Sequence, residues 1–378
     1  MRFAKGFPLF CNLPAGFTKL SKTLFHIVAF SRAQESNIKI TRWEAGYDFM
    51  RTVNSLFENE KHSTAPLRWN RISTLAGGFV WTALLLLPPF GAIHGIVEKL
   101  FLLAPLVIVP LGLSHVAPSG SKGWSTALHR VLIFIQPIGA IMAVVSFFIP
   151  SGTLAASFAA GWFFVSGMTA LLGLTRFLER KRHRAEELCT DSGLVYLAVG
   201  GTWLVIARFG LEPLGFGDVI VLLTAVHFHY AGFAALILAG LGGRRLRPST
   251  VGVRRIYQII VAGLISGPAL VAVGIVLSPI IGLIGALVLA ISFTLLAVLV
   301  VGWIIPDLPS KVTQIMLLIS AVSSTVGIAL ACLYAYSVTA KTLILTIPQM
   351  AMIHGVVNAI GFCLAGLIAW SLILRQNE

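Results

Sequence analysis

The sequence predicts an all-α integral membrane protein with about ten transmembrane helices, both termini in the cytoplasm and a short basic N-terminal extension. The first reason is composition: 57% of the residues are hydrophobic and 11% are charged, whereas roughly 25% are charged in soluble domains. The second is that apolar runs long enough to cross a bilayer recur from about Thr74 onward. The third is that basic residues concentrate in alternate connecting segments.

The apolar runs define ten expected spans, and their order determines which connecting segments share a side of the membrane. The runs lie near 74–90, 99–115, 130–150, 154–175, 192–210, 218–241, 256–277, 280–304, 312–337 and 347–374.

The distribution of Lys and Arg orients these spans, because basic residues accumulate on the cytoplasmic side. With the N-terminus inside, 25 of the 28 basic residues fall on the cytoplasmic side, and only Lys99, Arg208 and Lys341 fall outside. The net charge of +14 therefore follows from topology, and it does not indicate a nucleic-acid partner.

Residues 1–73 form a separate basic segment, and residues 74–378 form the polytopic domain. The first segment carries 11 Lys and Arg against 5 Asp and Glu, so we expect a cytoplasmic or interfacial extension attracted to anionic lipid, or a regulatory module. No short apolar run ends in a small-residue cleavage site, which argues against a secretory signal. The four cysteines lie far apart without CxxC spacing, which argues against a disulfide framework or zinc ribbon.

Polar residues gather in the second, sixth and tenth spans, which all run from outside to inside. Such residues are costly in a bilayer and favour a functional site. The inner half of the membrane carries few polar residues, with Gln136 the main exception. The candidate catalytic residues of the outer half are Glu98, Asp218, His227, His229, Tyr230, His354 and Asn358.

Helical spacing constrains how these residues meet. "IHGIVE" from Ile93 and "IHGVVN" from Ile353 resemble each other, which suggests an internal repeat. In each copy the histidine and the residue four positions on share a helix face and can hydrogen-bond. His227 and His229 point to nearly opposite sides of a regular helix, whereas His227 and Tyr230, three apart, share a face and could form a proton relay. The ordinary alternatives are a helix N-cap for Asp218 and interhelical hydrogen bonds for the histidines.

Three strings, "LLAPLVIVPLGL", "LTAVHFHYAGF" and "HGVVNAIGF", carry a resemblance to a known family. They resemble the YndJ-like family of bacterial polytopic membrane proteins over roughly Gly95 to the C-terminus. The resemblance implies a multi-pass protein of the inner (cytoplasmic) membrane and draws attention to the histidines. It implies no particular substrate.

Three functions remain open from the residues alone. The first is an acid–base enzyme that acts on an apolar lipid or isoprenoid substrate, because buried His, Tyr and carboxylate groups suit proton transfer. The second is a metal or haem site with His227, His229 and His354 as ligands. The third is a proton-coupled transporter or a membrane assembly factor. No phosphate loop, GxGxxG or GxSxG motif indicates a cofactor, and membrane lipid is the expected partner.

Overall fold

The computed structural model describes residues 65–86, 95–116, 123–246, 250–342 and 344–375. Within these ranges every regular element is helical and no strand occurs, as the sequence predicts. The basic segment before residue 65 lies outside the described residues, and so does His94.

The described part of the chain contains nine helices that are long and apolar enough to cross a membrane. They correspond to the second to tenth expected spans. The first expected span overlaps α2 (Ala65–Leu86), which is not among the nine. The nine helices are Ile96–Leu113, Trp124–Phe148, Thr153–Glu179, Ala185–Phe209, Asp218–Leu246, Val251–Leu277, Pro279–Asp307, Lys311–Thr339 and Ile347–Leu374.

Several of these spans are interrupted by π-helical turns and therefore carry more than one label. The second span comprises α3 (Ile96–Leu103), η1 (Ala104–Ile108) and α4 (Val109–Leu113), and the sixth comprises α8 (Asp218–His227), η3 (Phe228–Ala234) and α9 (Ala235–Leu246). The eighth comprises α11 (Pro279–Leu299), η4 (Val300–Ile304) and the 3₁₀ turn η5 (Ile305–Asp307), and the tenth comprises α13 (Ile347–Met350), η6 (Ala351–Gly355), η7 (Val357–Leu364) and α14 (Ala365–Arg375). The unbroken spans are α5 (Trp124–Phe148), α6 (Thr153–Glu179), α7 (Ala185–Phe209), α10 (Val251–Leu277) and α12 (Lys311–Thr339).

Two prolines explain the irregular second span. In the π pattern an N–H meets the carbonyl five residues earlier, so Pro110, which has no N–H, leaves the Pro105 carbonyl without that donor. Just before Pro105, the Ala104 N–H bonds to the Phe101 carbonyl and not to that of Leu100. Side chains from other helices supply the missing donors. The Tyr230 hydroxyl donates to the Leu100 carbonyl at 2.7 Å, and the Gln136 amide donates to the Pro105 carbonyl at 2.7 Å. The proline kinks thus tie the second span to its neighbours.

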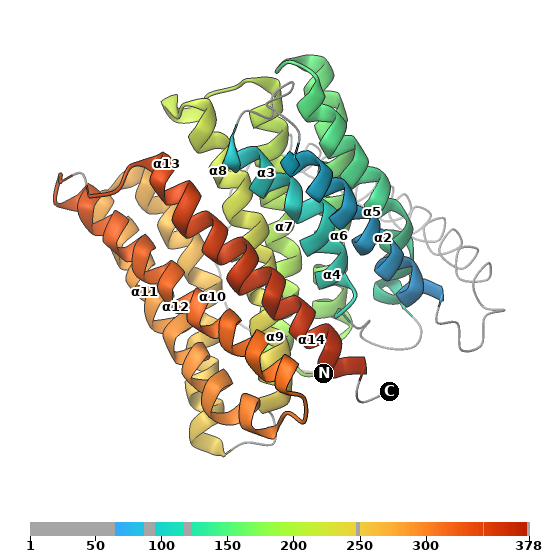
Figure 1. The fold of residues 1–378 in the computed structure, drawn as a ribbon, viewed down its shortest axis with the longest axis vertical. Helices are drawn as coiled ribbons and strands as arrows, with labels where there is room; N and C mark the ends of the chain where they lie inside the picture. The colour runs from blue at the N-terminus through green and yellow to red at the C-terminus, as the bar shows by residue number, and fades with distance from the viewer. Residues whose placement is uncertain (1–64, 87–94, 117–122, 247–249, 343, 376–378) are drawn as a thin grey trace, which may run out of the picture. The chain divides into compact units, whose positions relative to one another are not determined.

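The helices pack as two groups with the second, sixth and tenth spans between them. Helices α5, α6 and α7 pack against one another, and so do α10, α11 and α12. In Figure 1 the first group lies on the right and the second on the left, with the tenth span crossing in front. The second, sixth and tenth spans contact one another through α3, α8, η3, η6 and η7.

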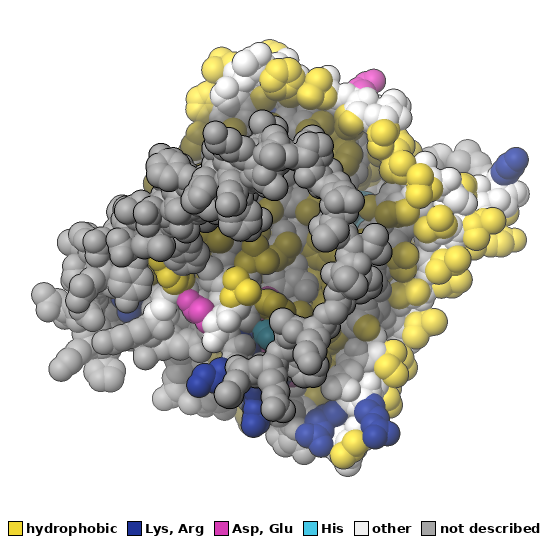
Figure 2. Space-filling model, turned by 180° about the vertical axis from the view of Figure 1, so that it is seen from behind, with side chains coloured by type: hydrophobic (Ala, Val, Ile, Leu, Met, Phe, Trp, Pro, Cys, Tyr) yellow, Lys and Arg dark blue, Asp and Glu magenta, His cyan; other side chains and the backbone are white. Residues whose placement is uncertain are grey.

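The surface supports the membrane assignment. Large apolar side chains such as Ile138, Ile141 and Ile284 are exposed on the outside of the helices. Figure 2 shows hydrophobic side chains along the sides of one face and most of its described Lys and Arg side chains gathered at one end. This arrangement is typical of a helical bundle that is surrounded by lipid tails.

Candidate functional site

The two predicted carboxylates serve the ends of helices. Glu98 accepts a hydrogen bond from the N–H of the N-cap residue Gly95 at 3.0 Å, at the start of α3. Asp218 is the first residue of α8 and follows the N-cap Gly217. The exposed Asp218 carboxylate accepts from the Val219 N–H at 2.6 Å. Both groups therefore stabilise local helix starts.

His229 is a buried tie between helices. Its side chain is fully buried, its Nδ1–H donates to the Ala225 carbonyl at 2.7 Å, and its Nε2 accepts from the Trp162 indole N–H at 2.8 Å. The ring also stands edge-on to Phe101, with centroids 5.0 Å apart. Both ring nitrogens are thus occupied. The close approach depends on Gly200, because a Cβ there would meet the imidazole at 2.6 Å.

Tyr230 is similarly committed, through the hydroxyl bond to Leu100 described above. It lies one turn from His227 along the chain, but its hydroxyl faces the second span and not the His227 ring. The expected His227–Tyr230 relay is therefore not formed by direct contact.

His227 and His354 do come together, from the sixth and tenth spans. Their rings are nearly parallel, with centroids 6.2 Å apart and planes at 27°. The Nδ1–H of His227 donates to the Leu223 carbonyl at 2.7 Å, and that of His354 donates to the Gly327 carbonyl at 2.8 Å. Because a carbonyl accepts only from a protonated nitrogen, Nδ1 carries the proton in the neutral form of each ring, and Nε2 is then the unprotonated acceptor.

Asn358 supports His354 from the same helix face. Its amide donates to the His354 carbonyl at 2.8 Å, and its nitrogen lies 3.2 Å from His354 Nδ1. Both side chains lie against Gly327 of α12, where a Cβ would overlap the Asn358 amide. The three histidines proposed as metal ligands do not converge, since His229 faces Trp162. Within the described part of the chain no three His, Cys, Asp or Glu side chains are grouped as metal ligands would be.

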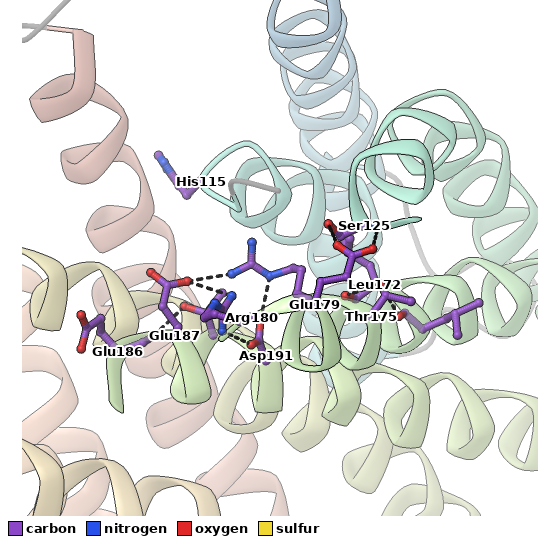
Figure 3. A network of polar contacts seen from close by, with 12 residues as sticks. His115, Ser125, Leu172, Thr175, Glu179, Arg180, Glu186, Glu187 and Asp191 are labelled. Carbon is purple, nitrogen blue, oxygen red and sulfur yellow. Dashed lines mark hydrogen bonds and ion pairs between the residues drawn. The ribbon is translucent and has the colours of Figure 1, made fainter. Parts of the chain in front are cut away.

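A buried ionic cluster joins α6, α7 and α9, and the sequence analysis missed it. Arg176, which is 1% exposed, pairs with Asp191 at 2.7 Å and with Glu187 at 2.8 Å. Arg180 pairs with the same two carboxylates at 2.6 and 3.3 Å. Arg244 pairs with Glu187 at 2.8 Å. Figure 3 shows these carboxylates converging on the arginines, with His115 nearby.

The cluster corrects the expected span boundaries. The fourth span was predicted to end at 175 and the fifth to begin at 192, which assigned the cluster's residues on these helices to a loop. Helix α6 instead continues to Glu179 and α7 begins at Ala185, so these helix ends, which the sequence assigns to the inner side, carry several polar groups. The signal that could have found the cluster is charge spacing: Arg176 and Arg180 are four apart, as are Glu187 and Asp191.

A large cavity lies beside this cluster. Its volume is about 1230 Å³, and its walls come from α2, the second span, α9 and the tenth span, with His129 from α5. The middle of the cavity is apolar, with Leu75, Leu103, Val107 and Leu111 in its walls. Apart from Thr74 and Thr82 of α2, its polar and charged lining residues are concentrated at one end: Asn70, Arg71, Ser114, His115, His129, Arg244, Arg245 and Ser371.

Two buried side chains at that end have polar atoms without a hydrogen-bond partner in the described part of the chain. Neither amide atom of Asn70, which is 1% exposed, meets a partner among the described residues, and neither does Nδ1 of His115, which is 7% exposed. The His115 Nε2–H points to the Leu367 carbonyl at 3.3 Å and to the Ser371 hydroxyl at 3.1 Å. Its Nδ1 is therefore an unfilled acceptor. Native proteins pair nearly all such groups, so each exception needs an explanation.

His115 is held neutral by its surroundings. Its pKa is lowered from the ordinary 6.5 to about 4, mainly by burial; the bond to Leu367 acts in the opposite direction, and the nearby positive charge of Arg244 adds to the lowering. Arg244 also donates to the His115 carbonyl at 3.2 Å. The ionic cluster and the cavity thus share Arg244.

Comparison with known proteins assigns the fold to a family. The model of the family described as "YndJ-like protein" matches residues 99–362. The chain belongs to the YndJ-like family. It is 33% identical over 279 residues to a Bacillus subtilis (strain 168) protein described as "Uncharacterized membrane protein YndJ". No solved structure matches the chain.

The extent of these matches matters for the site. The YndJ-like stretch contains the paired histidines, the ionic cluster and the second-span wall of the cavity. Helices α2 and α14, which complete the cavity, lie outside the stretch. The aligned part covers 73% of this chain and 49% of the Bacillus relative, so it spans about half the relative's length.

Proposed function

We propose that this YndJ-like protein handles a membrane lipid, and that it holds the apolar chain of a lipid or isoprenoid molecule in the cavity beside α2. The observation that carries the proposal is a large cavity with an apolar middle and a polar end. A volume of about 1230 Å³ exceeds the roughly 300–1,000 Å³ of ordinary ligand pockets. Its long apolar middle and polar end match the shape of an amphiphile.

The dimensions support a chain that lies along the membrane normal. The α2 residues in the cavity wall form one helix stripe from Asn70 to Thr82, which is about 18 Å at a rise of 1.5 Å per residue. One leaflet contributes about half of the roughly 30 Å hydrocarbon core. The cavity therefore has the length of a single leaflet.

The basic end of the cavity fits the proposed orientation. Arg71, Arg244 and Arg245 lie on the side that the charge distribution assigns to the cytoplasm. We place the protein in the inner (cytoplasmic) membrane with both termini in the cytoplasm, and the bound molecule would enter from the cytoplasmic leaflet.

An enzymatic step at the His227–His354 pair is a second candidate function. The unprotonated Nε2 atoms of the two rings, whose centroids lie 6.2 Å apart, favour proton transfer on a bound apolar substrate. His227→Gln and His354→Gln should then leave a folded protein that no longer converts a lipid that the wild type converts, as followed by mass spectrometry of incubated extracts. Equal conversion by wild type and both variants would refute this role.

Two glycines provide a matched test of the lipid cavity. A Cβ on Gly78 or on Gly167 meets no atom within 4 Å, but only Gly78 lines the cavity. Gly78→Phe should fill the cavity and remove lipid that copurifies with the wild-type protein, as measured by native mass spectrometry. Gly167→Phe should retain it. The same bound lipid in both variants would contradict the proposal.

A further inference from the structure

We infer that the basic end of this cavity binds the phosphate of a long-chain phosphate monoester. The inference rests on the proposed lipid-binding function and names the head group that the cavity selects. The molecule that carries this phosphate is either a lipid with a terminal phosphate or an isoprenyl phosphate, because both present the same group on an apolar chain.

Charge is the first argument. The cavity wall contains Arg71, Arg244 and Arg245, and no Asp or Glu occurs among its described lining residues. Arg244 is fixed in place by Glu187. In the described part of the chain, Arg71 and Arg245 form no ion pair. Both side chains are exposed, so an anionic head group at this end of the cavity can pair with them, and guanidinium groups match phosphate oxygens well.

Hydrogen bonding is the second argument, and it is independent of charge. The Asn70 amide offers donors and an acceptor, and His115 Nδ1 offers an acceptor. A phosphate monoester has a second pKa near 6, so one P–O–H is present in part of the population near neutral pH. Its oxygens accept from the Asn70 amide while its hydroxyl donates to His115 Nδ1. A phosphodiester has no P–O–H and leaves His115 Nδ1 unfilled unless another group on the head donates to it.

The position of these groups is the third argument. Asn70 starts the cavity stripe of α2, His115 follows the end of α4, and Arg244 and Arg245 lie in the last turn of α9. Three separate elements therefore deliver the unfilled groups to one end of the apolar cavity. Burying an unpaired amide destabilises the ligand-free protein, and ligand binding would recover that cost.

Because ligand binding satisfies the Asn70 amide, one substitution there should have opposite effects on the stability of the ligand-free protein and on its affinity for the ligand. Asn70→Leu replaces the unpaired amide with an apolar group of similar size, so the ligand-free protein should melt at a higher temperature. The same change should weaken binding of the phosphate monoester about tenfold, since hydrogen bonds to charged groups contribute about 1.5–3 kcal/mol. A residue with a purely structural role would not show this opposition.

The test uses full-length protein in detergent and two pairs of probes. Hexadecyl phosphate and hexadecanol form the straight-chain pair, and farnesyl phosphate and farnesol form the isoprenyl pair. Trp81 and Trp370 line the cavity, so binding is followed by tryptophan fluorescence. Each phosphate should bind at least about tenfold more tightly than its alcohol, and a preference between the two phosphates distinguishes the source.

Two variants that each remove one positive charge distinguish phosphate binding in the cavity from a general attraction of the anionic probe to a basic surface. Arg245→Gln should reduce phosphate affinity about tenfold and leave alcohol affinity unchanged, whereas Arg255→Gln, on an exposed residue outside the cavity, should change neither. Equal affinity for phosphate and alcohol would overturn the head-group assignment, and so would equal effects of the two arginine variants. Unchanged binding of all four probes by Gly78→Phe would instead refute the cavity itself.

Discussion

Buried polar groups are paired where the second, sixth and tenth spans cross, but they are incompletely paired at the basic end of the cavity. At the crossing, His229 and Tyr230 are fully engaged by backbone carbonyls and an indole N–H. At the cavity, Asn70 and His115 are buried without complete pairing. The rarity of a polar residue in an apolar helix therefore says little about ligand binding. Unfilled hydrogen-bonding capacity is the more informative property.

The largest effect should come from the ionic cluster that supports the cavity. Arg176→Met leaves Asp191 and Glu187 buried with fewer partners, and breaking a buried ion pair costs about 3–5 kcal/mol. We expect a loss of about 3 kcal/mol in the free energy of unfolding, measured by denaturant titration. Arg254→Met, at an exposed position, should change it by less than about 0.5 kcal/mol. Similar values for both would show that the cluster does not stabilise the fold.

His115 should give the cavity a pH-dependent stability. Its pKa is about 4 in the folded protein and 6.5 ordinarily, so the unfolded chain binds more protons between these values. The contribution of His115 to the free energy of unfolding is complete above pH 6.5. It falls as the pH decreases toward 4, by about 3 kcal/mol in all. Comparing His115→Gln with wild type across this range isolates it from the other histidines. Parallel pH profiles would contradict the assignment.

Substitutions at two adjacent glycines of α2 should distinguish a position packed against another helix from a position that faces the cavity. A Cβ on Gly77 would overlap the Leu106 carbonyl, whereas one on Gly78 meets nothing within 4 Å. Gly77→Ala should cost about 1–3 kcal/mol of stability. Gly78→Ala should raise stability by up to about 1 kcal/mol because alanine favours helix. The reverse order in thermal unfolding would mean that α2 does not pack on the second span in this way.

The smallest effect is expected at the crossing. Tyr230→Phe removes the hydroxyl that serves the Leu100 carbonyl and should lower stability by about 1 kcal/mol. Lipid binding in the fluorescence assay should not change, because Tyr230 does not line the cavity. Loss of binding without loss of stability would move the functional site from the cavity to the crossing.

The sequence predicted the membrane fold and the helical class because hydropathy alone determines both. It also identified the histidines that pair across the sixth and tenth spans. It offered a helix start as the ordinary alternative for Asp218, and Asp218 lies at one. It did not predict the same for Glu98, since hydrophobic periodicity does not reveal which backbone groups a side chain pairs with. The π turn beginning at Phe228 also changes the helical register on which the His227–Tyr230 relay was based.

The cavity was not predicted for a different reason. Its polar end combines Asn70, His115 and Arg244, which are far apart in sequence and lie at the ends of α2, the second span and α9. Each one resembles an ordinary residue at the membrane interface. Only the folded structure shows that all three line the same cavity.

The central claim is that lipid binds in the cavity and not at the histidine crossing. Photolabelling tests it directly, with a phosphatidic acid that carries a diazirine in one acyl chain, followed by peptide mapping of the labelled protein. The account predicts labels on α2 near Leu75 and Gly78 and on the tenth span near Ile368, with labelling lost in Gly78→Phe. Labels concentrated around His227 and His354, and unaffected by Gly78→Phe, would contradict it.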